Sequence, residues 1–153
     1  MSQTASLNSR IIESLYVEGL MLSDEVRAAF DPAHRSAGDP SSTAAIALSC
    51  EALRTTTRMM HAIAWLLNQR AYFSGELSEF QLRRHGRLPP AQPQPQHEHL
   101  DMLSPELCEL IERTQRFYAR IERLDEAWRT HFAMQPAAIQ RLRDRLGLAV
   151  VGF

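Results

Sequence analysis

The sequence predicts an all-α protein, a bundle of three long antiparallel helices, and two observations support this fold class. First, residues 44–73 contain neither proline nor glycine, so one long helix is expected there. Second, apolar residues on both sides of this stretch, at about 7–30 and 104–133, recur at spacings of three, four and seven. Alternating runs of β-branched residues and hairpin turn pairs, the signals of strands, do not compete with this pattern.

The composition fits one ordinary globular domain. A chain of 153 residues can bury a core, and we expect a single domain over 1–153. The formal net charge of −1 gives no electrostatic footprint for nucleic acid. No apolar run approaches the roughly 20 residues of a membrane span, and the N-terminus lacks the basic-then-apolar order of a signal peptide. We therefore expect a cytoplasmic protein in which Cys50 and Cys108 are buried thiols.

The first helix is expected at about 7–30. Its core-facing residues follow helical spacing and are Ile11, Leu15, Leu22, Val26 and Phe30. Gly19 falls inside this pattern, where glycine costs up to about 1 kcal/mol relative to alanine, and close approach of another helix would offset that cost. Asp31-Pro32 ends the helix. The short connection that follows makes the next helix antiparallel to the first.

The second helix is expected at about 41–73, with Ser41, Ser42 or Thr43 as its cap. Its apolar residues form two neighbouring stripes. One stripe consists of Ile46, Cys50, Leu53, Met60, Ala64 and Leu67. The other stripe consists of Ala45, Leu48, Ala52, Met59, Ile63 and Leu66. An apolar arc this wide needs protein on two sides. Because a thin three-helix bundle covers only part of it, we expect a homodimer.

A short helix and a linker are expected between the second and third long helices. The serine–glycine pair at 74–75 ends the second helix, and one or two helical turns should follow over 77–85. The cap and anchors of these turns would be Ser78, Phe80 and Leu82. Residues 88–99 read LPPAQPQPQHEH and contain little to bury. We therefore expect a flexible Pro/Gln-rich linker over about 86–103.

The third helix is expected at about 104–133. Ser104-Pro105-Glu106 places a cap, a proline in the first turn and an acidic residue near the positive end of the helix dipole. An a/d-like register then includes Leu107, Leu110, Ile111, Thr114, Phe117, Ile121, Leu124, Trp128 and Phe132. Pro136 is expected to break the helix, and a short final helix at about 136–146 should end at Gly147.

Candidate chemical sites are few. His97, Glu98, His99 and Asp101 form the one cluster that resembles metal ligands, and a proline-rich linker offers no fixed neighbours to orient them. The sequence contains no glycine-rich phosphate loop, nucleophile elbow or cysteine ligand pair. We therefore expect no metal, no cofactor and no enzymatic activity.

One polar strip of the central helix carries aromatic residues on a face that should be wet. The strip also carries Asn68 and Gln69, and its candidate contact residues are Glu51, Arg54, Arg58, His61, Trp65 and Tyr72. Aromatic residues beside arginine are typical of hot spots in protein interfaces. We therefore expect the strip to contact another protein or a second copy of the chain. The alternative is that residues 75–90 fold back and cover Trp65 with Phe80 or Leu82.

Two stretches of the chain, within about residues 10–80, resemble a known family. The first is LYVEGLML at 15–22, leading to RAAFD at 27–31. The second is EALRTTTRMM at 51–60, followed by AWLLNQRA at 64–71 and GELS at 75–78. These stretches are similar to the first helix, the central helix and its exit in the alphaproteobacterial regulator of CtrA degradation (RcdA) family, formerly a domain of unknown function (DUF1465).

The resemblance implies a dimeric bundle of three long helices and a non-catalytic adaptor role in regulated proteolysis. Such a protein would bind the ClpXP protease primed by a response-regulator-like adaptor, and would help to deliver cell-cycle regulators, in the cytoplasm and at a cell pole. The Pro/Gln-rich linker, His61 and the C-terminal LAVVGF are not matched to the family. Because of these departures, the resemblance does not identify which cell-cycle regulator, the client, would be delivered.

The alternative is a helical regulator that acts on transcription through DNA or a transcription factor. Arg141, Arg143 and Arg145 on the last short helix would contact phosphates, although such a set is also typical of a solvated face paired in part with Asp144. A salt-dependent DNA shift would favour this alternative. Co-purification with protease components would favour the adaptor.

Overall fold

The structure, a computed structural model, describes residues 2–32, 38–91 and 93–151, with side chains over 9–32, 38–91, 93–130 and 143–147. The described residues form helices and no strands, so the all-α prediction is confirmed. The chain divides into two compact units, Met1–Ile121 and Glu122–Phe153. The expected single domain over 1–153 stays a prediction.

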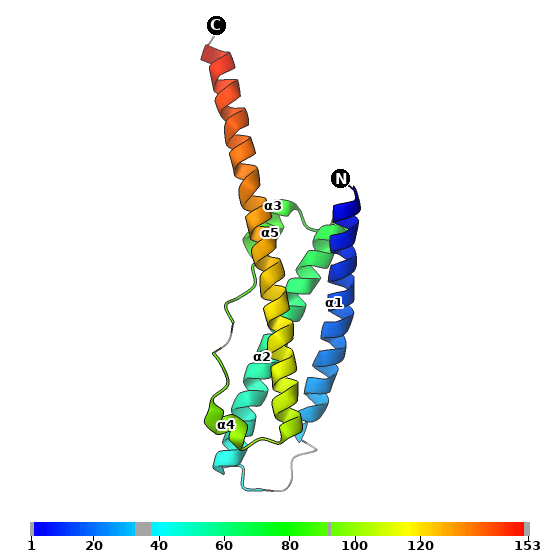
Figure 1. Ribbon diagram of the computed structural model, residues 1–153, viewed down its shortest axis with the longest axis vertical. Helices are drawn as coiled ribbons and strands as arrows, with labels where there is room; N and C mark the ends of the chain where they lie inside the picture. Colours follow the sequence, from blue (N-terminus) through cyan, green and yellow to red (C-terminus); the bar gives the residue numbers. More distant parts are fainter. Residues whose placement is uncertain (1, 33–37, 92, 152–153) are drawn as a thin grey trace. The chain divides into compact units, whose positions relative to one another are not determined.

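Two long helices, α1 (Ser2–Ala29) and α2 (Thr43–Phe73), pack against each other in the first unit (Figure 1). The α1 residues buried in the core recur at helical spacing and are Ile12, Leu15, Leu22, Val26 and Phe30. Ile12 takes the core position expected for Ile11, which is exposed. Successive helical residues lie about 100° apart, so only one of the two can face the core.

Local signals set the ends of the first helices as predicted. Ser42 caps α2, and its side-chain oxygen accepts a hydrogen bond from the N–H three residues further on, at 3.2 Å. Gly75 follows the last turn of α2 with φ of 83°, a conformation that glycine adopts without strain. Ser78 caps α3 (Glu79–His85) in a capping box with Gln81. These caps need no tertiary contact, which is why the sequence reveals them.

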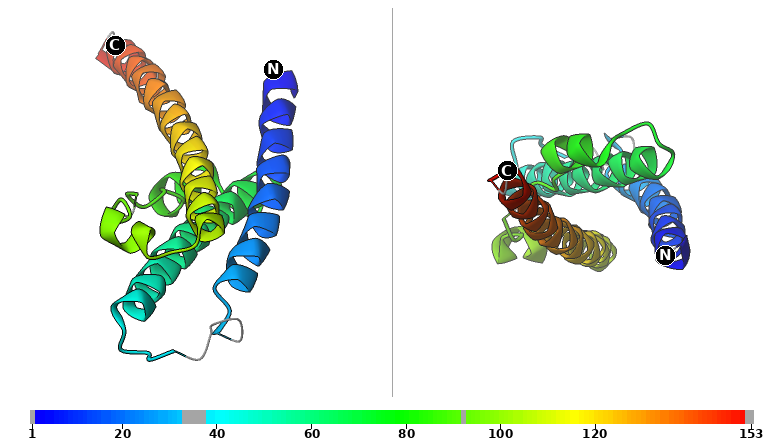
Figure 2. Two further views of the ribbon diagram at one scale, coloured as in Figure 1. Left: turned by 60° about the horizontal axis from the view of Figure 1, so that its bottom comes forward. Right: turned by 90° about the horizontal axis from the view of Figure 1, so that it is seen from above.

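Two short helices pack on α2. In α3, Leu82 is buried as expected, whereas Phe80 is exposed, so the anchoring role predicted for Phe80 is wrong. The two residues lie about 200° apart on the helix and cannot both face inward. The second short helix, α4 (His97–Asp101), lies inside the segment expected to be a flexible linker, and it contacts α2 (Figures 1 and 2).

The last helix, α5 (Pro105–Val151), is continuous through Pro136 and Gly147. Its start is as predicted, since the Ser104 side chain accepts a hydrogen bond from the Leu107 N–H at 3.3 Å. The predicted break at Pro136 and the separate helix at 136–146 are wrong. The sequences on either side of this proline, AMQ and AAIQRL, consist mainly of good helix formers, which offset the one backbone hydrogen bond that proline removes.

The two parts of α5 belong to different units. In the first unit, α5 contributes buried residues to the core, namely Leu110, Ile111, Thr114, Phe117, Tyr118 and Ile121. In the second unit, Arg129 pairs with Asp125 at 2.9 Å. The side chains of Arg141 and of residues 148–151, and the last two residues of the C-terminal LAVVGF, lie outside the described part of the chain. Over the described ranges, none of the helices has the length and apolar character needed to cross a bilayer.

Gly19 lies where α1 closely approaches other helices. A Cβ atom at this position would come within 2.9 Å of Ile63 Cδ1 and 3.0 Å of Phe117 Cζ, so the predicted close approach is confirmed. We expect Gly19→Leu to lower the free energy of unfolding by about 1–3 kcal/mol, because the larger side chain overpacks this contact. Gly147→Leu is the matched control, because a Cβ there meets nothing within 4 Å. Urea denaturation followed by circular dichroism measures both, and equal stability of the two variants would contradict the packing described here.

Candidate functional site

The polar strip predicted on α2 points into the protein. Its buried members are Glu51, Arg58 and Trp65, and its half-buried members are Arg54, His61 and Tyr72. The expectation that this face is wet is therefore wrong, and its role in protein contacts stays a prediction. The alternative, a cover of Trp65 by Phe80 or Leu82, agrees with the burial of Trp65 and Leu82, whereas Phe80 is exposed and does not take part.

Glu51 is the centre of a buried polar cluster. Its side chain is 0% exposed, and its Oε1 accepts a hydrogen bond from Arg54 Nη1 at 3.0 Å. The same oxygen lies 3.2 Å from Nδ1 of His99. Because His99 belongs to α4, this contact fixes the short helix to α2. The pair is separated by 48 residues, so no local pattern in the sequence indicates it.

Arg58 completes the cluster from the next turn of α2. Its Nη1 donates a hydrogen bond to Thr114 Oγ1 of α5 at 2.9 Å, and that hydroxyl donates to the Ile111 carbonyl at 2.7 Å. Burial lowers the pKa of Arg58, and the nearby Glu51 carboxylate opposes this shift. A buried cation whose compensating carboxylate is also buried makes this cluster sensitive to the loss of either charge.

The Pro/Gln-rich segment is held against the first part of α5. The Tyr118 hydroxyl donates a hydrogen bond to the Pro89 carbonyl at 2.6 Å, and Gln115 Nε2 donates to Gln94 Oε1 at 3.1 Å. Leu88 at the start of the segment is buried. The expectation of a flexible linker is therefore wrong for these residues, because side chains of α5 satisfy polar groups that a free linker would leave to water.

The cluster of histidines and acids at 97–101 does not converge on a metal site. Its residues form α4, in which His99 contacts Glu51. Throughout the described part of the chain, no group of three or more His, Cys, Asp or Glu side chains could hold a metal ion. The thiols of Cys50 and Cys108 are half-buried, where full burial was expected.

An apolar stripe lies on the opposite side of α2 and faces solvent. Its residues Ile46, Leu53, Met60 and Leu67 are 50%, 70%, 65% and 44% exposed. We call these four residues the α2 stripe. The other apolar stripe of α2 faces the core, where Met59 and Leu66 are buried. The chain therefore covers one of the two apolar faces of its central helix and leaves the second uncovered.

The geometry of the α2 stripe suits contact with another helix. A spacing of seven residues keeps the four side chains almost in line, which is the pattern of a coiled-coil seam. Thr57, Ala64 and Ala71 lie four residues after stripe positions, so small side chains border the seam. Exposed apolar patches are characteristic of surfaces that contact proteins, membranes or ligands.

Comparison with known proteins places the chain in a family. A family model described as "Protein of unknown function (DUF1465)" matches residues 3–150, so the protein belongs to this family and the predicted membership is confirmed. The name regulator of CtrA degradation, which the resemblance suggests, is compatible with this family. Neither the curated proteins nor the solved structures gave a match.

Proposed function

We propose that this DUF1465 protein is a non-catalytic adaptor in regulated proteolysis and that it acts as a homodimeric bundle of three long helices. The observation that supports the proposal is the α2 stripe, four large apolar side chains exposed in line on the central helix. The polar residues Glu51 and Arg58 are buried on the other side of that helix. A second copy of α2 would cover the stripe, so that both apolar faces of the helix would be buried.

The assignment to proteolysis comes from the family resemblance. The stretches at 15–31 and 51–78 are similar to the regulator of CtrA degradation family. In this proposal the protein binds ClpXP that a response-regulator-like adaptor has primed, and it delivers cell-cycle regulators by protein contacts alone. Its place of action would be the cytoplasm, at a cell pole.

The transcription-linked alternative rests on the arginines near the C-terminus. Arg143 and Arg145 are exposed, and so is Asp144 between them. The intervening carboxylate reduces the positive charge that a phosphate contact needs. This alternative stays a prediction, and a salt-dependent shift of DNA by the full chain would support it.

Affinity purification tests the proposed function directly. We expect the tagged chain to retain both protease subunits and a response-regulator-like adaptor. Deleting the gene for this protein should slow the degradation of at least one cell-cycle regulator. Re-expression of the wild-type chain should restore that turnover. Unchanged turnover of cell-cycle regulators in the deletion strain, with no protease retained by the tagged chain, would contradict the proposal.

A further inference from the structure

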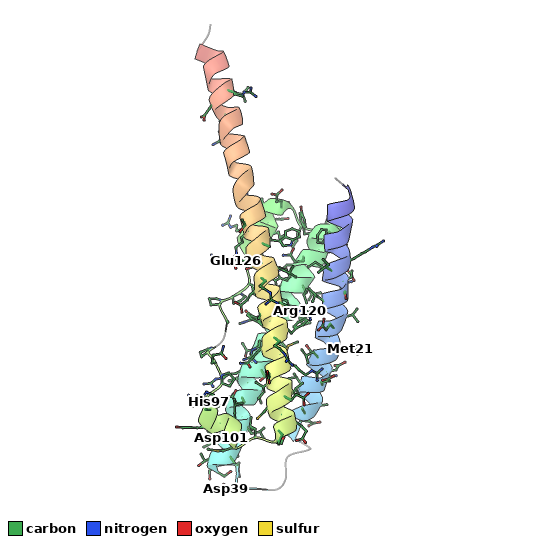
Figure 3. The ribbon with its side chains drawn as sticks, in the orientation of Figure 1. Met21, Asp39, His97, Asp101, Arg120 and Glu126 are labelled. Carbon is green, nitrogen blue, oxygen red and sulfur yellow. The ribbon has the colours of Figure 1, made fainter. Side chains whose placement is uncertain are left out.

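A groove with an apolar floor lies between α1 and the first part of α5. Its volume is about 430 Å³, and its lining residues belong to these two helices of the first unit. Leu22 and Phe117 form the buried part of the floor, whereas Val17 and Met21 are 54% and 63% exposed. Figure 3 labels Met21 on α1 and Arg120 on α5, which mark the two walls. The groove therefore offers large apolar side chains that a ligand can reach.

Two ion pairs join the walls of this groove. Glu25 accepts hydrogen bonds from Arg113 at 2.6 and 3.3 Å, and Glu18 accepts one from Arg120 at 2.8 Å. The hydrogen bond that Arg113 donates to the Glu25 carboxylate raises the pKa of Arg113. These four charges therefore pair with one another across the groove.

Arg116 is the third arginine on the α5 wall, and it differs from the other two. The nearest carboxylate oxygen that it pairs with is Glu112 Oε1 at 3.8 Å, beyond hydrogen-bond distance, and both side chains are largely exposed. An exposed pair of this length contributes little stability. Arg113 and Arg120 are engaged by Glu25 and Glu18, whereas, among the described residues, the guanidinium of Arg116 has only this long ion pair with Glu112.

We propose that this groove binds a segment of a partner protein that carries an acidic side chain next to a large apolar side chain. The carboxylate of this acid would accept two parallel N–H hydrogen bonds from the Arg116 guanidinium, which is the bidentate geometry of arginine–carboxylate pairs. The apolar side chain would lie on Met21 and Val17, and methionine adapts readily to the shape of a ligand. A volume of this size accepts one or two side chains of a peptide. This surface includes no residue of the α2 stripe, so the inference does not depend on the proposed dimer or on the assignment to proteolysis.

Selection from a phage-displayed library of random twelve-residue peptides, with the full chain as target, tests the inference. We expect the enriched peptides to carry Asp or Glu beside Leu, Ile, Met or Phe. Fluorescence anisotropy with the enriched synthetic peptides should then show an affinity about tenfold lower for Arg116→Gln and for Met21→Ser. Arg27→Gln is the matched control, because Arg27 is an exposed arginine outside the groove, and it should leave the affinity unchanged.

Three results would overturn the inference. The first is that the library yields no binder, or only binders without an acidic residue. The second is that the two groove variants bind the peptides as tightly as the wild type does. The third is that Met21→Ser converts a dimer into a monomer, which would identify the groove as a contact between two copies of the chain. Because Met21 and Arg116 are largely exposed, both variants should keep the thermal stability of the wild type, and circular dichroism checks this.

Discussion

Replacement of Glu51 by leucine is expected to lower the free energy of unfolding by about 3–5 kcal/mol, because it removes the carboxylate that compensates a buried cation. Arg58 is buried, and the hydrogen bond that it donates to the Thr114 hydroxyl brings no negative charge to compensate the guanidinium. Arg54 is only half-buried and can turn to water when its partner is lost. The cost therefore falls mainly on Arg58. Urea denaturation at a fixed protein concentration measures it, since the stability of an oligomer depends on concentration.

A second substitution separates charge compensation from packing. If Arg58 without a carboxylate is the source of the loss, Arg58→Met in the Glu51→Leu chain should recover most of it, because both buried charges of this cluster, Glu51 and Arg58, are then removed. Glu112→Leu is the matched surface control, with an expected change below about 1 kcal/mol, because its pair with Arg116 is exposed. Equal losses from Glu51→Leu and Glu112→Leu, or a double variant less stable than Glu51→Leu alone, would contradict this explanation.

Replacement of Leu53 and Met60 by glutamate is expected to convert the proposed dimer into a monomer. Burying a leucine or methionine side chain contributes about 1.5–3 kcal/mol, and each copy would lose two such contributions. The dissociation constant should therefore rise about a thousandfold or more. Because both residues are exposed on the single chain, the monomer should keep its fold. Light scattering coupled to gel filtration measures the mass, and circular dichroism measures the fold.

Phe80→Glu is the control for that double variant. Phe80 is 69% exposed on α3, as accessible as the stripe residues but outside the stripe. Its substitution should leave the mass of the wild type unchanged. If Phe80→Glu dissociates the protein and the stripe variant does not, the contact between copies lies elsewhere.

The parts of the fold that short stretches of sequence control could be predicted. Ser42, Gly75 and Ser78 end or begin helices through contacts within a few residues, and the structure places each as expected. The continuity of α5 could not be predicted in the same way. Pro136 alone disfavours a helix, because it removes one backbone hydrogen bond. The good helix formers on both sides of it together offset that free-energy cost.

The orientation of α2 could not be predicted from its own sequence. Apolar residues cover so much of its circumference that the pattern does not decide which arc faces the core. The choice depends on distant residues. Thr114 accepts a hydrogen bond from Arg58 across 56 positions, and His99 contacts Glu51 across 48. These partners turn the polar strip inward and leave the α2 stripe in water, the reverse of the expectation for Trp65 and Arg58.

Methionine oxidation tests most directly whether a second copy covers the α2 stripe. Met60 and Met21 are 65% and 63% exposed on the single chain, so they provide an internal comparison, and the buried Met59 provides a slow reference. With dilute hydrogen peroxide and mass spectrometry, Met60 should react several times more slowly than Met21 at high protein concentration and equally fast after dilution to the monomer. If Met60 reacts as fast as Met21 at every concentration, no second copy covers the stripe.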